Sequence, residues 1–187
     1  MRNDGTMTNR ERFWTTFSEL MGEDMTAREE HFTDFYKNQF GETKSSTSCE
    51  PLSAKAVRLL REKGYTVILA TNPLFPSVAT HRRIRWAGLE PEDFSLVTTY
   101  EEELYCKPNL RYYESILERF EKKPDQCMMV GNDVDEDMCA VSLGLKGYLL
   151  TDCLLNRHER PLTGFLAGSF SEFYSYVEQL PALREKG

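Results

Sequence analysis

A cluster of acidic residues directly follows an apolar run. Cys127–Val130 predicts a buried strand and Gly131 permits a tight turn, and Asp133 and Asp137 then stand four residues apart on one face of the turn and of an expected helix. Crowded carboxylates repel one another unless they lie in solvent or share a hard cation such as Mg²⁺. Because a buried strand precedes this cluster, we favour the metal over the solvated surface. The spacing excludes an EF-hand loop.

A hydroxyl and a lysine stand at similar positions elsewhere. Thr71 and Asn72 follow the apolar run Val67–Ala70, so the hydroxyl and backbone N–H of Thr71 should emerge where a strand ends and can hold a phosphoryl oxygen. Lys107 precedes Pro108 at the start of a predicted helix, where the cation and the helix dipole both favour an anion. The alternatives are an ordinary strand-ending turn and a solvated lysine. Together with the carboxylates, these groups suit a phosphate beside a divalent metal.

The elements that must position these residues alternate between helix and strand from about residue 50 onward. Such alternation indicates β-α-β units and a parallel sheet, hence an α/β fold that binds ligands at the carboxyl ends of its strands. The predicted helices span residues 51–63, 77–86, 110–122, 135–143 and 170–180, and the predicted strands span 66–70, 94–98, 127–130 and 148–151.

The first 45 residues follow a different pattern. Two amphipathic helices are predicted, over 8–22 and from about residue 26 to 40, with capping boxes at Thr8 and Thr26. Their aromatic stripes favour packing over an aromatic ligand cage. The small polar stretch 41–48 resembles a linker, so we predict a helical segment over 1–45 and a core domain over 46–187.

Three of these fragments, taken in order, resemble the second, third and fourth motifs of the haloacid dehalogenase-like hydrolases. The resemblance covers about residues 50–155, and the matching fragments are Ala70-Thr71-Asn72, Lys107-Pro108-Asn109 followed by Tyr112-Tyr113, and Val130-Gly131-Asn132-Asp133 with Asp137. It implies a Rossmann-like core and Mg²⁺-dependent hydrolysis of a small phosphorylated metabolite through an aspartyl-phosphate.

The resemblance also implies a role for each matching residue. Thr71 with Asn72 would bind the phosphoryl group, Lys107 would offset negative charge, and Asp133 and Asp137 would anchor Mg²⁺. Many relatives have aspartate directly after the glycine, where this chain has Asn132. Either Asn132 or Asp133 could therefore face the metal.

The first motif of these hydrolases, D-x-D-x-T at the end of the central strand, has no full counterpart. The sequence offers Asp4-Gly5-Thr6, which places the nucleophile's position on Arg2, and arginine cannot accept a phosphoryl group. No apolar strand precedes this segment, so we interpret it as a turn before the Thr8 cap. We therefore expect a chain truncated at its N-terminus, with residues 1–45 as the remnant of a helical cap.

Two further expectations follow from this interpretation. Either the sheet should show a gap or a closer approach between the strands ending at Ala70 and Val130, or the chain should form a swapped dimer. The chain should also have little or no turnover. A non-catalytic phosphate- and metal-binding module of the same fold is the alternative. A 2-haloacid dehalogenase is less favoured, because such relatives need no acidic metal cluster.

Composition excludes several other classes. A net charge of -7 argues against a nucleic-acid partner and an anionic membrane surface. The five cysteines are odd in number and lack C-x-x-C spacing, which indicates reduced thiols in a cytoplasmic protein rather than disulfides or a zinc site. No signal peptide is recognised and the apolar runs are too short to cross a bilayer. The sequence does not predict an oligomeric state.

Overall fold

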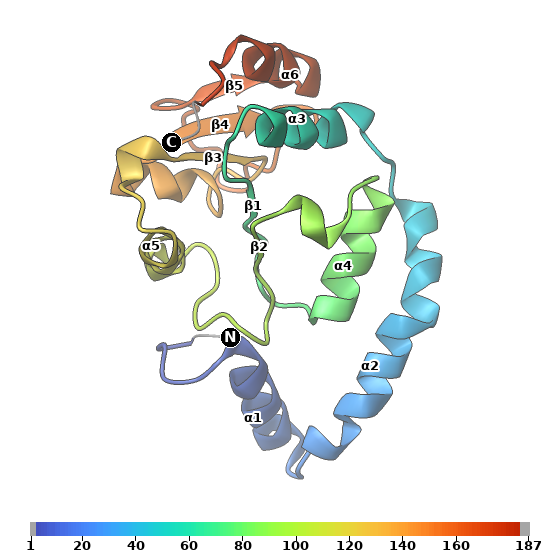
Figure 1. The fold of residues 1–187 in the computed structure, drawn as a ribbon. Helices are drawn as coiled ribbons and strands as arrows, with labels where there is room; N and C mark the ends of the chain where they lie inside the picture. Colours follow the sequence, from blue (N-terminus) through green and yellow to red (C-terminus); the bar gives the residue numbers. More distant parts are fainter. Residues whose placement is uncertain (1–2, 184–187) are drawn as a thin grey trace. The chain divides into compact units, whose positions relative to one another are not determined.

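The computed structural model describes residues 3–183 (Figure 1). These residues divide into two compact units. The first unit runs through Cys106 and includes Leu183, and the second spans Lys107–Ala182. This division does not coincide with the predicted boundary between residues 45 and 46, and the assignment of residues 1–45 to a cap stays a prediction. Arg2 lies outside the described residues.

Two short parallel strands organise the first unit. β1 (Ile68–Leu69) pairs with β2 (Leu96–Val97), with Ile68 opposite Leu96. Both strands are shorter than predicted. At the end of β1 the N–H of Thr71 donates to the carbonyl of Leu69, at 3.2 Å, in a tight turn that ends the strand. α3 (Pro51–Glu62) and α4 (Ser77–Trp86) pack with this sheet, and α4 has the predicted bounds. The apolar cluster that joins them consists of Ala54, Val57, Leu69, Ile84, Leu89, Phe94 and Val97.

The N-terminal helices form as predicted, with one correction to their capping. α1 (Asn9–Met21) begins at a capping box in which the Thr8 side chain accepts from the Glu11 N–H and the Glu11 side chain accepts from the Thr8 N–H. The second helix, α2 (Glu29–Lys37), has no capping box at Thr26. Asp24 accepts hydrogen bonds from the N–H and hydroxyl of Thr26, at 2.9 and 2.6 Å, so a 3₁₀ turn over Thr26–Arg28 precedes the helix.

The stretch predicted as a linker is instead part of a 3₁₀ helix, Gln39–Ser46. Its hydroxyl groups explain the difference, because Thr43, Ser45 and Ser46 each donate to the carbonyl three residues earlier, at 2.7–2.9 Å. These side-chain hydrogen bonds support a tight turn that small polar residues would otherwise leave irregular.

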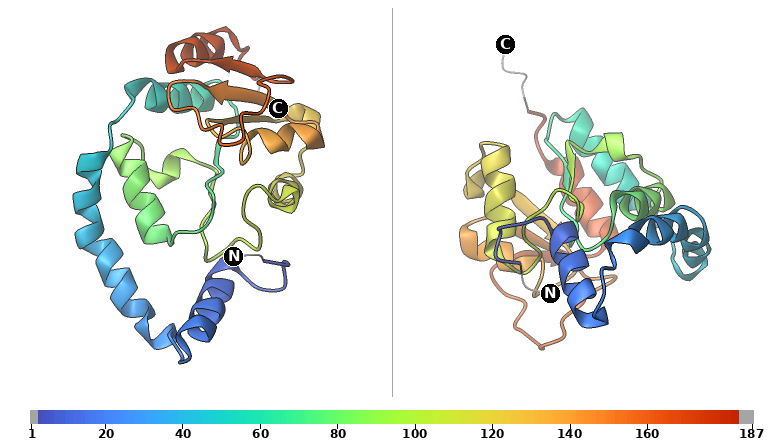
Figure 2. Two further views of the ribbon diagram at one scale, coloured as in Figure 1. Left: turned by 180° about the vertical axis from the view of Figure 1, so that it is seen from behind. Right: turned by 90° about the horizontal axis from the view of Figure 1, so that it is seen from below.

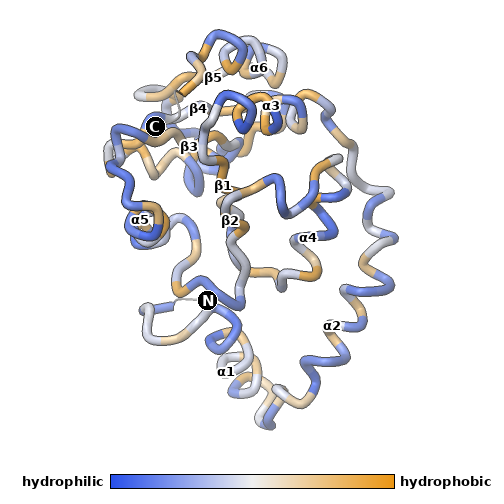
Figure 3. The backbone as a smooth tube through the Cα atoms, in the orientation of Figure 1, coloured by the Kyte–Doolittle hydropathy of each residue, from blue (hydrophilic) through white to orange (hydrophobic). Residues whose placement is uncertain are grey.

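Aromatic side chains of the N-terminal helices pack on one another, as expected. Trp14 meets Phe32 edge to face with ring centroids 5.5 Å apart, and Phe40 stacks on Trp86 of α4 at 5.3 Å. Along α2 the tube in Figure 3 alternates between hydrophilic and hydrophobic residues.

A three-stranded parallel sheet forms the centre of the second unit. β4 (Lys146–Leu150) lies between β3 (Met128–Gly131) and β5 (Leu166–Gly168), with Val130 opposite Tyr148. The two helices of this unit are α5 (Leu110–Arg119) and α6 (Phe170–Gln179). α6 packs on the sheet (Figure 2). The ring centroids of Tyr148 and Phe173 lie 4.8 Å apart at this contact. β5 was not predicted, because its three residues include alanine and glycine, which have low strand propensity.

The observed strand pairing confirms the parallel α/β class. Within residues 3–183 the strands form two separate sheets, one of β1 and β2 and one of β3, β4 and β5. No helix in the same range has the length and apolar character needed to cross a membrane. All five cysteines are free thiols.

Candidate active site

The turn after β3 is closed by its own carboxylates. Oδ2 of Asp137 accepts hydrogen bonds from the N–H groups of Asn132 and Asp133, both at 3.0 Å. Oδ1 of Asp133 accepts from those of Asp135 and Glu136, both at 2.9 Å. The predicted helix over 135–143 is therefore wrong in its first turn, because the side chains bind the amides in a non-helical arrangement. Helical structure starts only at Met138, as a 3₁₀ helix that ends at Leu143.

Gly131 makes the return of Asp137 possible. A Cβ atom at residue 131 would lie 2.1 Å from Oδ2 of Asp137 and 2.4 Å from its Cγ. Such distances are far inside van der Waals contact, and any side chain would push the carboxylate away from the two amides. The absence of a side chain at residue 131 therefore allows the carboxylate of Asp137 to pack against the backbone of the turn.

Lys107 forms a buried ion pair with the same aspartate. Its Nζ lies 2.6 Å from Oδ1 of Asp137, and the two side chains are only 5% and 9% exposed. The ammonium also lies about 6 Å from the ring centroids of Tyr112 and Tyr113 on α5. Such a pair is costly to break, because removal of one partner leaves a buried charge uncompensated.

A tyrosine connects α5 to the acidic turn. The hydroxyl of Tyr113 donates to the carbonyl of Glu136 at 2.5 Å, and burial raises the pKa of this phenol well above its ordinary value. Tyr113 is therefore a neutral donor at physiological pH. It fixes the middle of the turn to the helix that begins just after Lys107.

The loop that follows β4 brings three basic side chains to the turn. Nη1 of Arg157 lies 2.6 Å from Oδ2 of Asp133, while His158, at 2.7 Å, and Arg160 both pair with Asp135. The hydrogen bond from His158, with the charge of Arg160, lowers the pKa of Asp135. Sequence reasoning missed these residues, although the run Arg157-His158-Glu159-Arg160 is a visible basic signal after the acidic one.

Asn132 and Asp133 differ in what their side chains contact. The amide of Asn132 donates to the carbonyl of Cys153 at 2.7 Å, so it fastens the loop. Asp133 is buried in the turn beside Asp137. The structure therefore brings Lys107, Asp133 and Asp137 together, and it directs the side chain of Asn132 to the loop.

The other predicted site residues lie in the first unit. Thr71 donates its hydroxyl to the carbonyl of Thr98 at 2.7 Å and its N–H to the hydroxyl of Thr98 at 2.9 Å. The Asn72 carbonyl accepts from the N–H of Leu74 at 2.8 Å. Asp4 accepts from the N–H of Thr6 at 3.1 Å, so the segment resembling the first motif forms a turn before α1, as interpreted from the sequence.

Comparison with known proteins identifies the family. A model of the haloacid dehalogenase-like hydrolases matches residues 4–141, which is well over half of the chain. The chain belongs to the haloacid dehalogenase-like hydrolases.

Two kinds of relative accompany this match. A glyceraldehyde 3-phosphate phosphatase of Methanothermobacter thermautotrophicus is 24% identical over 176 residues, which cover 86% of this chain and 76% of the relative. Among solved structures, a HAD phosphatase from Thermococcus onnurineus matches with a TM-score of 0.62 and 17% identity, covering 91% of this chain and 72% of its own. A predicted phosphoglycolate phosphatase from Haemophilus somnus 129pt matches with a TM-score of 0.59 and 18% identity, covering 89% and 74%. At these identities the solved structures support the fold.

Asp133 supplies the carboxylate oxygen of this hydrolase that could hold a metal ion. Within residues 3–183 no group of three or more His, Cys, Asp or Glu side chains is arranged to hold a metal ion. Mg²⁺ is commonly bound by one or two carboxylates together with waters and substrate phosphate. Asp133, with one carboxylate oxygen held only by a side chain, suits that mode.

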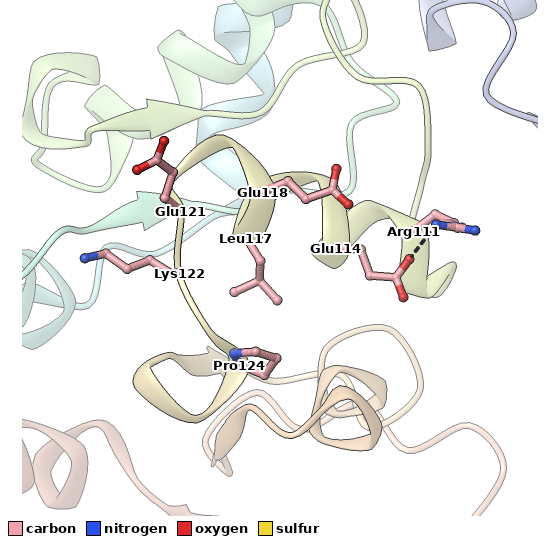
Figure 4. Close-up of a pocket in the computed structure, with 7 residues that line it drawn as sticks. All are labelled: Arg111, Glu114, Leu117, Glu118, Glu121, Lys122 and Pro124. Carbon is pink, nitrogen blue, oxygen red and sulfur yellow. Dashed lines mark ion pairs between the residues drawn. The ribbon is translucent and has the colours of Figure 1, made fainter.

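A shallow groove along α5 of the hydrolase holds none of the predicted site residues (Figure 4). Leu117 and Pro124 lie among charges of both signs, and Arg111 pairs with Glu114 at 3.2 Å. Because its charges are mixed and partly paired, the groove indicates no class of ligand.

Proposed function

We propose that this hydrolase is a Mg²⁺-dependent phosphatase that acts on a small phosphate monoester. The observation that best supports this is the distribution of donors over the two buried carboxylates. Both oxygens of Asp137 and Oδ1 of Asp133 are bonded to backbone amides or to Lys107. Oδ2 of Asp133 is paired only with an exposed arginine in the part of the chain described, so it is the carboxylate oxygen whose partner an incoming cation could replace.

Each residue of the turn then has a distinct task. Asp133 would be the direct metal ligand, whereas Asp137 would fix Lys107 and the amides around it. Mg²⁺, when bound, would neutralise phosphate charge and make the phosphorus more open to attack. Lys107 supplies a second cation on a rigid support, and electrostatic stabilisation of this kind is usually a large term in catalysis. Thr71 and Asn72 would contribute hydrogen bonds to phosphoryl oxygens.

The proposal needs a carboxylate nucleophile, and the sequence has Arg2 at the corresponding position. We therefore propose that the chain as written binds phosphate and Mg²⁺ with little turnover. A carboxylate supplied at that position would attack phosphorus, release the alcohol and form an aspartyl-phosphate, which water then hydrolyses. The names of the phosphatase relatives support a small phosphorylated metabolite as the substrate. A cytoplasmic location belongs to the same proposal.

Hydrolysis of an aryl phosphate tests the proposal. Three proteins are compared with and without Mg²⁺: the chain as written, its Arg2→Asp variant, and a version extended by an apolar strand that ends in D-x-D-x-T. We expect Mg²⁺-dependent turnover in the extended version and its loss on Asp133→Asn. The matched control is Asp125→Asn, an exposed aspartate of the same unit. Turnover that survives Asp133→Asn or removal of the metal would contradict the assignment.

The same assay separates the two alternatives. A binding module of this fold would bind inorganic phosphate in the presence of Mg²⁺ and would not turn over even in the extended version. A dehalogenase would release halide from a 2-halo acid without any metal. Each of these outcomes differs from that expected of the phosphatase.

A further inference from the structure

Arg157 occupies the carboxylate oxygen that the proposed metal would need. Its Nη1 lies 2.6 Å from Oδ2 of Asp133. The guanidinium side chain is 56% exposed, whereas the aspartate side chain is 7% exposed. The pair therefore joins a fixed, buried anion to a cation that can exchange its partner for solvent.

The backbone near Arg157 is fastened to the turn independently of this ion pair. Leu155, two residues earlier, donates its N–H to the carbonyl of Asn132 at 2.8 Å and accepts from the N–H of Val134 at 2.9 Å. On both sides of Arg157, the loop is closed by reciprocal hydrogen bonds between Asn156 and Arg160, both at 2.9 Å. The side chain of Arg157 can consequently leave Asp133 while its Cα stays beside the site.

We propose that Arg157 is the cation that Mg²⁺ displaces from Asp133, and that its released guanidinium then binds the anionic group of the substrate. This inference rests on the proposed function. A divalent ion on this oxygen would compete with the arginine for the charge of the same carboxylate, and the two cations repel each other, so we expect metal binding to weaken the ion pair and displace the guanidinium. Once moved, it lies near the phosphate that the metal and Lys107 attract, and guanidinium binds phosphate through paired hydrogen bonds.

The proposal predicts opposite effects of Arg157→Ala on two affinities. Loss of the competitor should tighten Mg²⁺ binding, and loss of the anion-binding group should weaken phosphate binding, each by about three- to tenfold for one charge-assisted contact. Mg²⁺ affinity is measured by competition against Mn²⁺ followed by electron paramagnetic resonance. The affinity for inorganic phosphate is measured by equilibrium dialysis at equal metal saturation. Neither measurement needs turnover.

Arg160→Ala is the matched control. Arg160 belongs to the same loop, is similarly exposed at 60%, and pairs with Asp135 rather than Asp133. Its substitution removes the same charge and should change both affinities less than about twofold, as expected of a screened surface charge. Thermal unfolding confirms that both variants are folded.

The remaining outcomes overturn the proposal. If Arg157 only held Asp133 in position, its removal would weaken both ligands. An arginine without a role would change neither, and tighter Mg²⁺ with unchanged phosphate affinity would exclude the anion-binding step. If instead Asp133→Asn leaves Mg²⁺ affinity unaltered, the metal assignment of the proposed function fails, whatever Arg157 does.

Discussion

The two groups of predicted site residues differ in how their polar atoms are already bonded within the protein. In the first unit, the hydroxyl and N–H of Thr71 both bond to Thr98 of the neighbouring chain segment. In the second unit, Lys107 and Asp137 are locked together, while one oxygen of Asp133 faces an exposed arginine. The polar groups of Thr71 are therefore already hydrogen-bonded within the first unit, whereas Asp133 has a partner that can be exchanged for a ligand.

This difference affects how much each group must rearrange when a ligand binds. A charge held by buried partners needs little reorganisation when a ligand arrives, which is the basis of electrostatic preorganisation. A hydroxyl already used in the sheet must exchange that bond for one to the ligand. The comparison therefore predicts that variants around Asp137 affect both folding and binding strongly, whereas variants at Thr71 have smaller effects.

The largest effect is expected from Lys107→Ala. The variant leaves Asp137 buried without its cation, and loss of one partner of a buried pair typically costs about 3–5 kcal/mol. Urea unfolding, followed by circular dichroism, measures the change in free energy. Binding of inorganic phosphate should also fall below detection.

Lys146→Ala serves as the control, because this lysine is exposed at the start of β4 in the same unit. Its removal should change stability by less than about 0.5 kcal/mol, as is usual at the surface. Equal, small losses for both lysines would show that the Lys107–Asp137 pair contributes nothing to the stability of the turn.

Gly131→Ala should have the next largest effect. The added methyl group would meet the carboxylate of Asp137 at 2.1 Å, and overpacking of this kind typically costs about 1–3 kcal/mol. Phosphate affinity should fall as well, since Asp137 could no longer hold Lys107 in place. Thermal unfolding and equilibrium dialysis give the two quantities.

Gly164→Ala distinguishes a steric effect from backbone strain. Gly164 has φ +87° and no atom within 4 Å of the position that an added methyl group would take, so its alanine variant strains only the backbone. It should leave phosphate affinity unaltered. If both glycine variants keep full affinity, Gly131 is not needed for the geometry of the site.

The features that the sequence predicted correctly are those that depend on local pattern. Lys107 and the spacing of Asp133 and Asp137 predicted a charged cluster, and the structure places the three together. Apolar periodicity predicted α4 within its observed bounds. These features depend on local pattern, which a sequence states directly.

Features that depend on tertiary hydrogen bonds were not accessible. The helix predicted from Asp135 is replaced by turns, because carboxylates in the turn bind its own amides. The bond from Thr71 to Thr98 joins residues 27 positions apart, and Arg157 reaches Asp133 across 24. Neither contact has a signal in local periodicity, so the hydrogen bonding of Thr71 and the ion pair of Arg157 required the structure.

A pair of threonine variants tests the first unit. Thr71→Val keeps the shape but removes the hydroxyl and its contacts with Thr98, at about 1 kcal/mol per hydrogen bond, whereas Thr98→Val removes the hydroxyl that accepts from the N–H of Thr71, at about 1–3 kcal/mol. If Thr71 belongs to the phosphate site, only its own variant should weaken phosphate binding. Chemical unfolding and dialysis on both proteins provide the comparison. A phosphate affinity that is reduced equally by the two variants, in line with stability, would remove Thr71 from the proposed site.

The smallest effect is expected from Tyr113→Phe, which removes the hydroxyl that donates to the Glu136 carbonyl and that also contacts Cys139. Its loss should cost about 1 kcal/mol at pH 7. The cost should also depend on pH. Burial raises the pKa of Tyr113 above its value in the unfolded chain, so the folded state binds this proton more tightly.

The sign of the pH dependence follows from that tighter binding. The contribution of Tyr113 is complete below about pH 10, the ordinary pKa of a phenol, and is lost as the pH rises beyond that value. Phenylalanine does not titrate, so the deficit of the variant relative to the parent should shrink above about pH 10. Urea unfolding from about pH 7 to about pH 11, a range that spans the ordinary phenol pKa, measures this difference in unfolding free energy. Tyr174→Phe on α6 is the control for a general effect of replacing a tyrosine. A deficit that stays constant over this range would mean that Tyr113 is not shielded from solvent, and that the acidic turn is held less firmly to α5 than its geometry indicates.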